Sequence, residues 1–584
     1  MKNKPNKQKP GQDKRVIKKI PVKKKDDAGI PFYYVAILLA VTCIAFYPCI
    51  SNGFTGWDEQ PYIVNNPLIK HLSIENTKRI FSEVYLANYQ PLHLFSYMVE
   101  YHFFGLKASG YHWVSLFMHL VNVLLVLWFT KIISKNNYIS FFTALLFAVT
   151  PLRVESVAWA AERKDLLYSM FFFAALISYL FYLRGNRNRK YLVYTFLFFI
   201  LSVFSKTMAV SLVPVLFLLD YFNNRKFSGK VILEKIPFIV IAFVMGIISV
   251  KASSAAESID ANSYFSFTDR IFFACQNLLM YAGKLILPVN LSSYYAYPFL
   301  ENGHIPLSYY ISGIGVIILA ILVLWSMKKG KLIFFCTGYF VSTVALVLML
   351  IPVGPTIFSE RYSYVPSVMF YFLILFYLFN YVAKQNSKQS KIVTSVVLVA
   401  CSLIFVQITR QRCTIWKDGI TLWSDVLKND DKNPHAYNNR GFEYKLLNEN
   451  GLAISDLNNA IKLKQDYPEP YSSLCDIYGS MGKFDSALYF ANKALAIKPD
   501  MPQALNNRGI LRAMRNNPDS ALMDFNHAIQ VQPDMYEAYT NRGILFRSKG
   551  NIDAALQDFD RSIMLNPDFA KAFQQKEITL KNKK

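Results

Sequence analysis

The sequence predicts an all-α protein in two parts: a polytopic helical membrane domain of about eleven spans, and a C-terminal α-solenoid of helical repeats. The first observation is composition. Of 584 residues, 53% are hydrophobic and 17% are charged, and the mean hydropathy of +0.22 is rare in soluble proteins. The second observation is a period of 34 residues after Arg410, which is typical of stacked helical units. The composition excludes a soluble secreted domain, a disordered chain and a fibrous protein.

Residues 1–30 form a basic segment with eleven Lys and Arg, three Asp and no apolar core. We predict a solvated cytosolic tail, because positive charge stays on the cytosolic side of membranes. Nucleic-acid binding is not expected, since no folded reader domain accompanies the tail. The next run, 31–50, spans about twenty residues and lacks an A-x-A cleavage site, so it predicts a retained transmembrane helix and not a signal peptide.

The membrane domain is predicted at 31–409. Its eleven apolar runs lie near 31–50, 111–130, 138–158, 166–183, 191–204, 208–222, 231–250, 307–327, 332–351, 368–383 and 392–409. Short connections such as 131–137 and 184–190 carry Lys or Arg and no acid, which places them in the cytosol. Nearly all carboxylates of the membrane domain fall in the remaining connections, which we place outside the cytosol. The first of these external loops is 51–110. An odd number of spans then places the C-terminal domain outside.

Segment 271–287 is apolar, but both of its flanks resemble external loops. We interpret it as interfacial or re-entrant and buried against protein.

Small residues, aromatic residues and prolines hold a constant phase in the C-terminal part. Ala453, Ala487, Ala521 and Ala555 are spaced by 34 residues. The pattern resembles the tetratricopeptide repeat (TPR), a pair of closely packed helices. It predicts a connecting helix at 410–433, four repeats at 434–568 and a capping helix at 569–584.

One repeat position carries an amide in three of the repeats: Asn439, Asn507 and Asn541. In TPR superhelices this position faces the concave groove, where an amide can bind a peptide backbone. The arrangement resembles the asparagine ladder of the soluble O-linked GlcNAc transferase. The alternative is that Asn is simply common at this packing position. Taken alone, the array indicates only a protein-binding module.

Charged residues gather on the predicted external face, at or near span ends. An acidic pair, Asp58 and Glu59, follows the first span. The other members are His93, Glu155, Arg163, Lys164, Asp165, Lys206, Glu360 and Arg361. A loop carboxylate can serve solubility alone, but charged groups at membrane depth are costly and usually functional. Cations beside carboxylates suit a lipid-linked phosphate next to a general base.

Several stretches in order resemble the transmembrane-and-TPR O-mannosyltransferases (TMTC family). They are Trp57-Asp-Glu-Gln-Pro-Tyr62, Tyr89-Gln-Pro-Leu-His-Leu-Phe-Ser-Tyr97, Phe147-Ala-Val-Thr-Pro-Leu-Arg-Val-Glu-Ser-Val-Ala-Trp159, Glu162-Arg-Lys-Asp165, Phe204-Ser-Lys-Thr-Met-Ala-Val210, Leu219-Asp-Tyr221, Leu287-Pro-Val-Asn-Leu-Ser292 and Ser359-Glu-Arg-Tyr362. With the repeats, the resemblance covers nearly everything after the basic tail. It implies a GT-C-like membrane fold, a polyprenyl-phosphate sugar donor and an acidic motif in the first external loop.

The resemblance implies that Asp58 is the catalytic base and that Glu59 completes the acidic pair. Candidates for the donor-phosphate site are Glu155, Arg163, Asp165, Lys206, Glu360 and Arg361. Two stretches depart from the eukaryotic relatives. Glu162-Arg-Lys-Asp165 stands where Gly-Arg-Ala-Asp is more frequent, so Lys164 is extra, and Thr150-Pro-Leu-Arg153 stands where many have His-Pro-x-His.

The expected function is a membrane glycosyltransferase that moves a sugar, by resemblance mannose, to a Ser or Thr hydroxyl of a protein on the extracytoplasmic side. The TPR groove would hold the acceptor. One alternative is a non-enzymatic TPR scaffold, which needs no acidic pair at the external surface. Another is a transporter of lipid-linked sugar, which needs ionisable groups in mid-span.

The only small molecule implied is the lipid-linked sugar itself. No metal-ligand cluster of suitable spacing is visible, and a divalent metal ion is left open as a cofactor. The seven Cys include no C-x-x-C pair, so neither a zinc site nor a disulfide framework is expected. The basic tail suits a bacterial inner membrane with periplasmic repeats, or, in a eukaryote, the endoplasmic reticulum with lumenal repeats.

Overall fold

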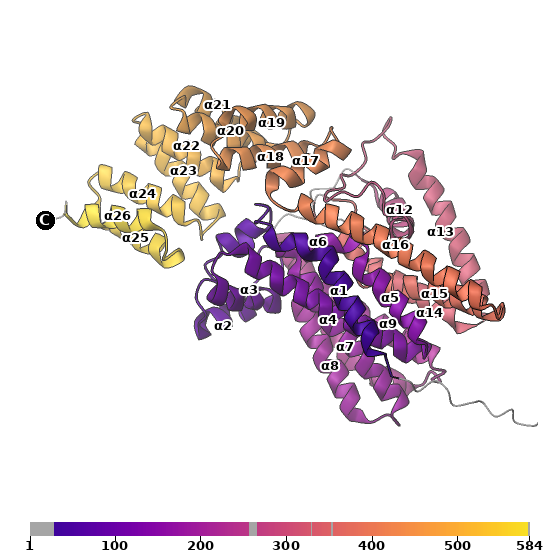
Figure 1. The fold of residues 1–584 in the computed structure, drawn as a ribbon. Coiled ribbons are helices and arrows are strands. Elements are labelled where there is room, and N and C mark those ends of the chain that lie inside the picture. The colour runs from indigo at the N-terminus through magenta and orange to yellow at the C-terminus, as the bar shows by residue number, and fades with distance from the viewer. Residues whose placement is uncertain (1–28, 256–264, 329, 352–353, 355, 582–584) are drawn as a thin grey trace, which may run out of the picture.

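The computed structural model describes residues 29–255, 265–328, 330–351, 354 and 356–581. Within these ranges the chain is helical, apart from loops and isolated bridges. The predicted all-α class and the helical repeats after the membrane part are confirmed. Figure 1 shows the repeats as an arc beside the end of the membrane part that carries α2, α3 and α6. Most of the predicted basic tail lies outside the described residues.

The membrane part contains a helix at each of the predicted apolar runs. Its helices are α1 (Phe32–Phe46), α2 (Ile74–Ser82), α3 (Pro91–Phe104), α4 (Ala108–Ser134), α5 (Asn137–Val149), α6 (Val154–Ala158), α7 (Arg163–Arg184), α8 (Arg189–Ser205), α9 (Leu212–Phe222), α10 (Gly229–Leu233), α11 (Ile236–Ala255), α12 (Phe267–Ile286), α13 (Leu307–Ser326), α14 (Lys331–Val344), α15 (Ser367–Lys384) and α16 (Lys388–Ile415).

Helix length limits how many of these elements can cross a bilayer alone. Among the described residues, six helical segments are long and apolar enough, and a seventh results if α5 and the bent continuation to Ala158 count as one span. Shorter apolar helices lie at Thr207–Phe222, Ile236–Ala252 and Leu332–Val347. The structure therefore supports a multi-pass membrane protein with six or seven spans by length, and the predicted number of about eleven is not shown.

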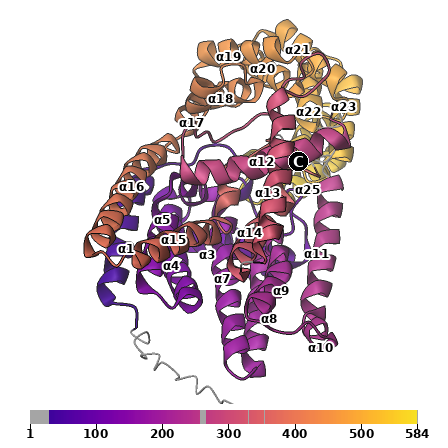
Figure 2. The same ribbon diagram turned by 90° about the vertical axis from the view of Figure 1, so that its right-hand side faces the viewer.

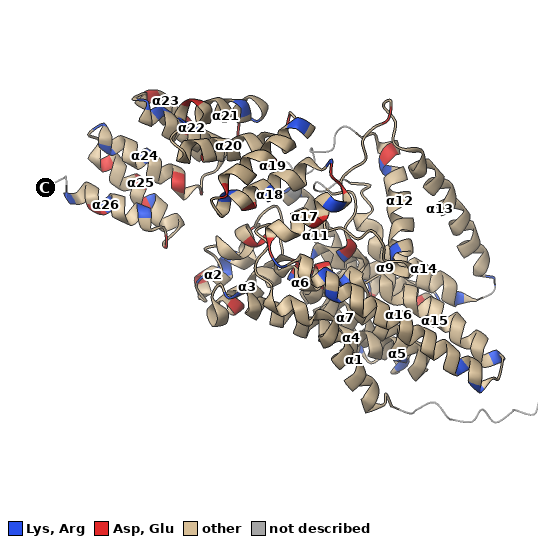
Figure 3. Ribbon diagram, turned by 45° about the horizontal axis from the view of Figure 1, so that its top comes forward, with Lys and Arg blue, Asp and Glu red and all other residues tan. Residues whose placement is uncertain are grey.

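Charge distribution agrees with a membrane location. In Figure 3 the helices of the membrane part are uncharged along most of their length, while Lys, Arg, Asp and Glu gather at helix ends and along the repeats. Helix α12 has a different orientation from its neighbours: Figure 2 shows it lying crosswise to α7 and α13. It is also absent from the segments that are apolar enough to span. The interfacial or re-entrant position of 271–287 stays a prediction.

The repeat part begins at α17 (Gly419–Asn429) and ends at α26 (Ala570–Lys581). Between them lie the pairs α18 (Pro434–Leu446) and α19 (Asn450–Leu463), α20 (Pro468–Ser480) and α21 (Phe484–Ile497), α22 (Pro502–Met514) and α23 (Pro518–Val531), and α24 (Tyr536–Ser548) and α25 (Ile552–Leu565). Prolines begin three of the four first helices, where the missing N–H costs no hydrogen bond. In the later repeats, a Cβ at Gly509 or Gly543 would lie 2.7 Å from the facing Phe ring, so glycine permits the close packing.

An ion pair recurs between the two helices of a repeat. Arg440 with Asp456, Arg508 with Asp524 and Arg542 with Asp558 each form two N–H···O bonds of 2.7–3.0 Å. The second repeat has Leu474 and Phe490 at these positions. The bidentate geometry fixes the angle between the paired helices more than a single contact would.

Candidate active site

The acidic pair lies in the loop that follows α1, and this loop is anchored to the junction between the two parts of the protein. The Asn52 side-chain amide donates to the Cys413 carbonyl at 2.9 Å, and the Gly53 N–H donates to the Lys417 carbonyl at 2.9 Å. Cys413 lies in the last turn of α16 and Lys417 follows directly after that helix, where the chain enters the repeats. The position of the loop is thus coupled to the start of the repeat array.

Four tryptophans reinforce this junction. The ring of Trp57 stacks on Trp159 with centroids 4.6 Å apart and lies 4.7 Å from Trp423, and Trp159 stacks on Trp416 at 5.3 Å. Trp159, Trp416 and Trp423 are fully buried. Aromatic pairs of this kind contribute about 1 kcal/mol each beyond area burial. Since Trp57 immediately precedes Asp58, this stack holds the backbone of the acidic pair.

The two carboxylates of the pair have different surroundings. Glu59 is 1% exposed and accepts a 2.8 Å hydrogen bond from the Thr55 hydroxyl. Burial, together with the neighbouring charge of Asp58, raises its pKa from 4.5 to about 7. Asp58 is half-buried. Its pKa is raised by burial and by Glu162, against the opposing charges of Lys164 and Arg361. The charges of Glu162, Lys164 and Arg361 thus influence the pKa of Asp58, whereas the charge that acts on Glu59 is that of Asp58.

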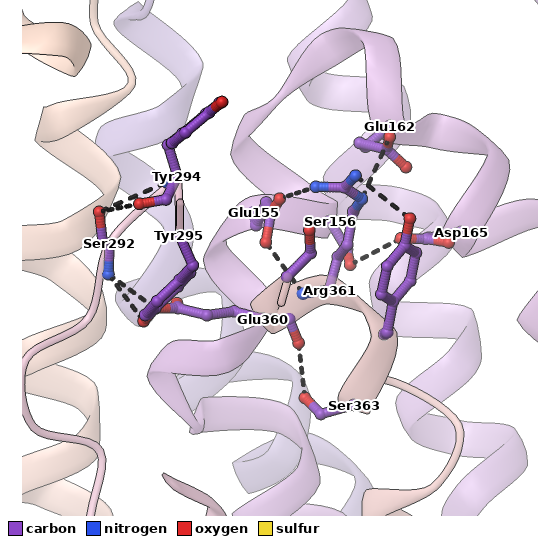
Figure 4. Close-up of polar contacts among 12 residues, drawn as sticks. Glu155, Ser156, Glu162, Asp165, Ser292, Tyr294, Tyr295, Glu360, Arg361 and Ser363 are labelled. Atoms are coloured by element: carbon purple, nitrogen blue, oxygen red, sulfur yellow. Dashed lines mark hydrogen bonds and ion pairs between the residues drawn. The ribbon is translucent and has the colours of Figure 1, made fainter. Parts of the chain in front are cut away.

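A group of charged side chains is centred on Glu162, and its other members come from α6, the start of α7, the segment after α8 and the segment before α15. Glu162 Oε1 lies 3.1 Å from Lys164 Nζ and 3.4 Å from Arg361 Nε, and Glu162 Oε2 lies 3.6 Å from Lys206 Nζ. Figure 4 shows Arg361 between Glu155 and Glu162. One buried carboxylate thus contacts three cations.

Two further carboxylates complete the group. Asp165 Oδ1 lies 2.5 Å from Lys206 Nζ, and Glu155 pairs with the guanidinium of Arg361 while also accepting the Arg361 N–H at 2.9 Å. We call Glu155, Glu162, Lys164, Asp165, Lys206 and Arg361 the charge cluster. Burial of so many charges is costly unless each is paired, and this density is typical of a functional site.

Two predicted site residues lie apart from the charge cluster. Arg163 is fully buried and pairs with Glu100, and its guanidinium also donates to the Tyr111 carbonyl at 2.7 Å and to the Ser115 hydroxyl at 3.2 Å. It therefore holds α3 and α4 against α7. Glu360 accepts from the Tyr295 hydroxyl at 2.7 Å and from the Ser292 N–H at 2.9 Å, which fixes the loop before α13.

Sequence reasoning placed Lys164 on the external face but did not identify Glu162 as the centre of the cluster. The signal was available, since Glu162 and Lys164 are the two positions at which the stretch Glu162-Arg-Lys-Asp165 departs from the Gly-Arg-Ala-Asp of the eukaryotic relatives. The structure pairs the two departures with each other. His93 is buried and its ring contacts the Tyr97 hydroxyl at 2.8 Å.

The three amides of the repeat position have partners within the array. Asn439 accepts from Asn438 at 3.0 Å, Asn507 donates to Asp476, and Asn541 donates to Asn506 at 2.9 Å. These contacts favour the packing interpretation for Asn507 and Asn541. Asn439 also lines a cavity of about 630 Å³ between the acidic loop and the first three repeats.

Among the described residues, no group of three or more His, Cys, Asp or Glu side chains is placed to hold a metal ion. The three cations of the charge cluster can bind an anionic ligand, and an ionised carboxylate such as that of Asp58 can accept a proton.

Comparison with known proteins agrees with this arrangement. Tetratricopeptide repeat models match residues 434–467 and 536–569. The chain is 24% identical over 462 residues to Protein O-mannosyl-transferase F38B6.6 of Caenorhabditis elegans, a match that covers 74% of this chain and 63% of that protein. It is 30% identical over 161 residues to Protein O-mannosyl-transferase TMTC1 of Mus musculus, covering 26% and 17% respectively.

Among solved structures, a thermophilic TPR protein of Thermus thermophilus is 18% identical, with a TM-score of 0.26, and the match covers 33% of this chain and 99% of that one. The chain spans less than two thirds of the length of the mannosyltransferases it matches. The match to the Caenorhabditis elegans protein extends well beyond the repeats, because the repeats alone account for far less than 74% of the chain. The chain is therefore a multi-pass homologue of the TMTC-family protein O-mannosyltransferases that carries tetratricopeptide repeats.

Proposed function

We propose that this protein is a membrane O-mannosyltransferase that takes its sugar from a polyprenyl phosphate and transfers it to a Ser or Thr hydroxyl of a polypeptide. The observation that carries the proposal is the charge cluster, in which three cations contact the buried Glu162 carboxylate and whose charges act on the half-buried Asp58. A base next to cations is what transfer from a phosphate leaving group needs. A scaffold would leave this buried charge cluster without a role.

In the proposed reaction, the acceptor hydroxyl oxygen attacks C1 of the sugar while Asp58 takes the hydroxyl proton. The bond between C1 and the phosphate oxygen breaks, and its electron pair leaves with the polyprenyl phosphate. A phosphate leaving group needs charge neutralisation more than a strong general acid. We assign this role to Lys164, Lys206 and Arg361, and we assign Arg163 a positioning role because its contacts are with Glu100 and Tyr111.

Glu162 accounts for how three cations remain together before a donor binds. It contacts all three within 3.6 Å, which offsets their mutual repulsion. A donor phosphate would share the cations with Glu162. Among the described residues, Lys164 forms an ion pair with Glu162 alone, whereas Lys206 and Arg361 each pair with a second carboxylate. Lys164 is therefore the cation that a donor phosphate can bind with the least competition.

The polyprenyl chain also needs an apolar path within the membrane. A groove of about 540 Å³ is lined by side chains of α12, α13, α14 and α15, almost all of them apolar. Its walls continue from the segment that carries Arg361: Tyr281 of α12 donates to the Ser359 carbonyl at 3.2 Å, and α15 begins at Ser367. We assign this groove to the lipid chain.

The proposal requires the charge cluster and the repeats on the extracytoplasmic side. It adopts eleven spans with the N-terminus in the cytosol, so that in a bacterial inner membrane the repeats are periplasmic. Reporter fusions after Lys190 and after Lys432 should then report opposite sides of the membrane. Signals from the same side would contradict the eleven-span topology.

The function is tested on purified protein with a panel of radiolabelled polyprenyl-phosphate sugars and Ser/Thr-containing peptides. The expected result is transfer to peptide with release of polyprenyl phosphate, and with mannose as the preferred sugar. Absence of transfer from every donor, with folded protein and intact donors, would contradict the proposal.

A further inference from the structure

The cavity of about 630 Å³ has walls from both parts of the protein. One wall is the acidic loop, through Gly56, Trp57, Gln60 and Asn65. The other is made by the first helices of three successive repeats, α18, α20 and α22, together with Trp423 of α17. The repeats lie over this end of the membrane part in Figure 1. A ligand in this cavity would therefore touch the repeats and lie beside the segment that carries Asp58.

The charged groups that line the cavity are mostly acidic. They are the carboxylates of Glu443, Glu469 and Asp476 and the single ammonium of Lys445. Lys445 pairs with Asp476 at 2.8 Å. Within the described residues, Glu443 and Glu469 have neither an ion-pair nor a hydrogen-bond partner. The cavity thus presents two carboxylates that the protein itself does not neutralise.

A neutral acceptor atom in the same cavity is also unsatisfied. Asn438 is 7% exposed and its side-chain nitrogen donates to Asn439 at 3.0 Å, but its Oδ1 has no partner. A buried polar atom without a partner costs about 1–3 kcal/mol. Glu443, Glu469 and Asn438 Oδ1 are all hydrogen-bond acceptors, so a ligand that carries donors complements them.

The position of Glu443 indicates that the ligand should carry a positive charge. Its carboxylate lies directly against the acidic loop, since a Cβ on Gly56 would clash with Glu443 Oε1, and Gly56 has a φ of +71°. Burial and the charges of Glu59 and Asp418 raise the pKa of Glu443 to about 7. A cation placed here would relieve repulsion between carboxylates of the two parts.

We propose that this cavity binds an extended polypeptide segment that carries Lys or Arg close to the hydroxyl to be modified. A basic side chain pairs with Glu443 and Glu469, and a backbone N–H of the segment donates to Asn438 Oδ1. Trp57 and Trp423 give the segment apolar surface. This inference rests on the proposed function, because it names the acceptor class for that reaction.

Direct binding to the full-length protein in nanodiscs tests the inference without any sugar donor. Two fluorescent peptides of identical length and Ser/Thr content are compared, one with Lys at two positions and one with Gln there. We expect the Lys peptide to bind about tenfold more tightly at low salt, with the difference shrinking as salt rises. Equal affinity of the wild type for both peptides would overturn the inference.

Matched variants assign the preference to the cavity. Glu443→Gln with Glu469→Gln should reduce the preference to less than about twofold. These changes remove repulsion, so the melting temperature should not fall. Asp485→Asn with Asp519→Asn changes the net charge equally on the exposed face of α21 and α23 and should leave the preference intact. A preference that survives the first pair of changes, or disappears with the second, would also overturn the inference.

Binding and transfer can fail separately. Selective binding of the Lys peptide by a protein that transfers no sugar would refute the proposed function and support this acceptor site. Transfer to Lys and Gln peptides alike, with equal affinities, would refute the acceptor site and support the function.

Discussion

Replacing Glu59 by Gln should change how the stability of the protein depends on pH. Its pKa is raised from 4.5 to about 7, first by burial and further by the charge of Asp58. The folded state therefore holds a proton that the unfolded state releases between those pH values. Stability is fully present below pH 4.5 and is lost as pH rises through about 7. The loss is about 3 kcal/mol for this group.

Gln at position 59 cannot ionise and still offers an oxygen to the Thr55 hydroxyl, which donates at 2.8 Å. The variant and the wild type should therefore have similar melting temperatures at pH 4.5, and the variant should melt higher at pH 8. Tryptophan fluorescence during heating in detergent measures this. The control is Glu75→Gln, an exposed position in the same loop, with no pH-dependent difference. A variant that melts lower than wild type at pH 8 would refute the reasoning.

Lys164→Met should raise the KM for the lipid-linked donor about tenfold, because one cation that would bind the phosphate is lost. It should also move the acid limb of the pH–rate profile to higher pH, because the charge of Lys164 lowers the pKa of Asp58. An acid limb at the wild-type pH would contradict this. Replacing Asn439, Asn507 and Asn541 together by Ala should lower the melting temperature of the repeats, because these amides have hydrogen-bond partners within the array. If peptide binding falls while the repeats keep their melting temperature, the groove interpretation is correct instead.

Much of the fold could be predicted because its signals are local. Each apolar run contains a helix, and the 34-residue phase marks every repeat. The number of crossings could not be predicted from composition, because several apolar helices are shorter than a bilayer and depend on how they pack. The Arg440–Asp456 ion pair recurs in two other repeats at multiples of the 34-residue period. The pair could therefore have been predicted from the sequence, although it was not.

The sequence predicted which residues gather at the candidate site, but not which side chains form ion pairs with each other. Charge and position placed Asp58, Lys206 and Arg361 on one face. Which carboxylate each cation contacts depends on tertiary packing: Glu155 and Arg361 are 206 positions apart. Arg163 was one of several candidates for the phosphate site, and the sequence could not show that its guanidinium pairs with Glu100 and donates to the Tyr111 carbonyl.

The central claim is that Asp58 is the general base for sugar transfer, and Asp58→Asn in the purified full-length protein tests it most directly. Asn keeps the size of the side chain but cannot take the hydroxyl proton. The rate of sugar transfer from a polyprenyl phosphate to peptide should fall by about 10²–10⁴-fold, with peptide affinity and melting temperature unchanged. Glu75→Gln should transfer at the wild-type rate. Full transfer by Asp58→Asn would contradict the account and make Glu59 or Glu155 the next candidate for the base.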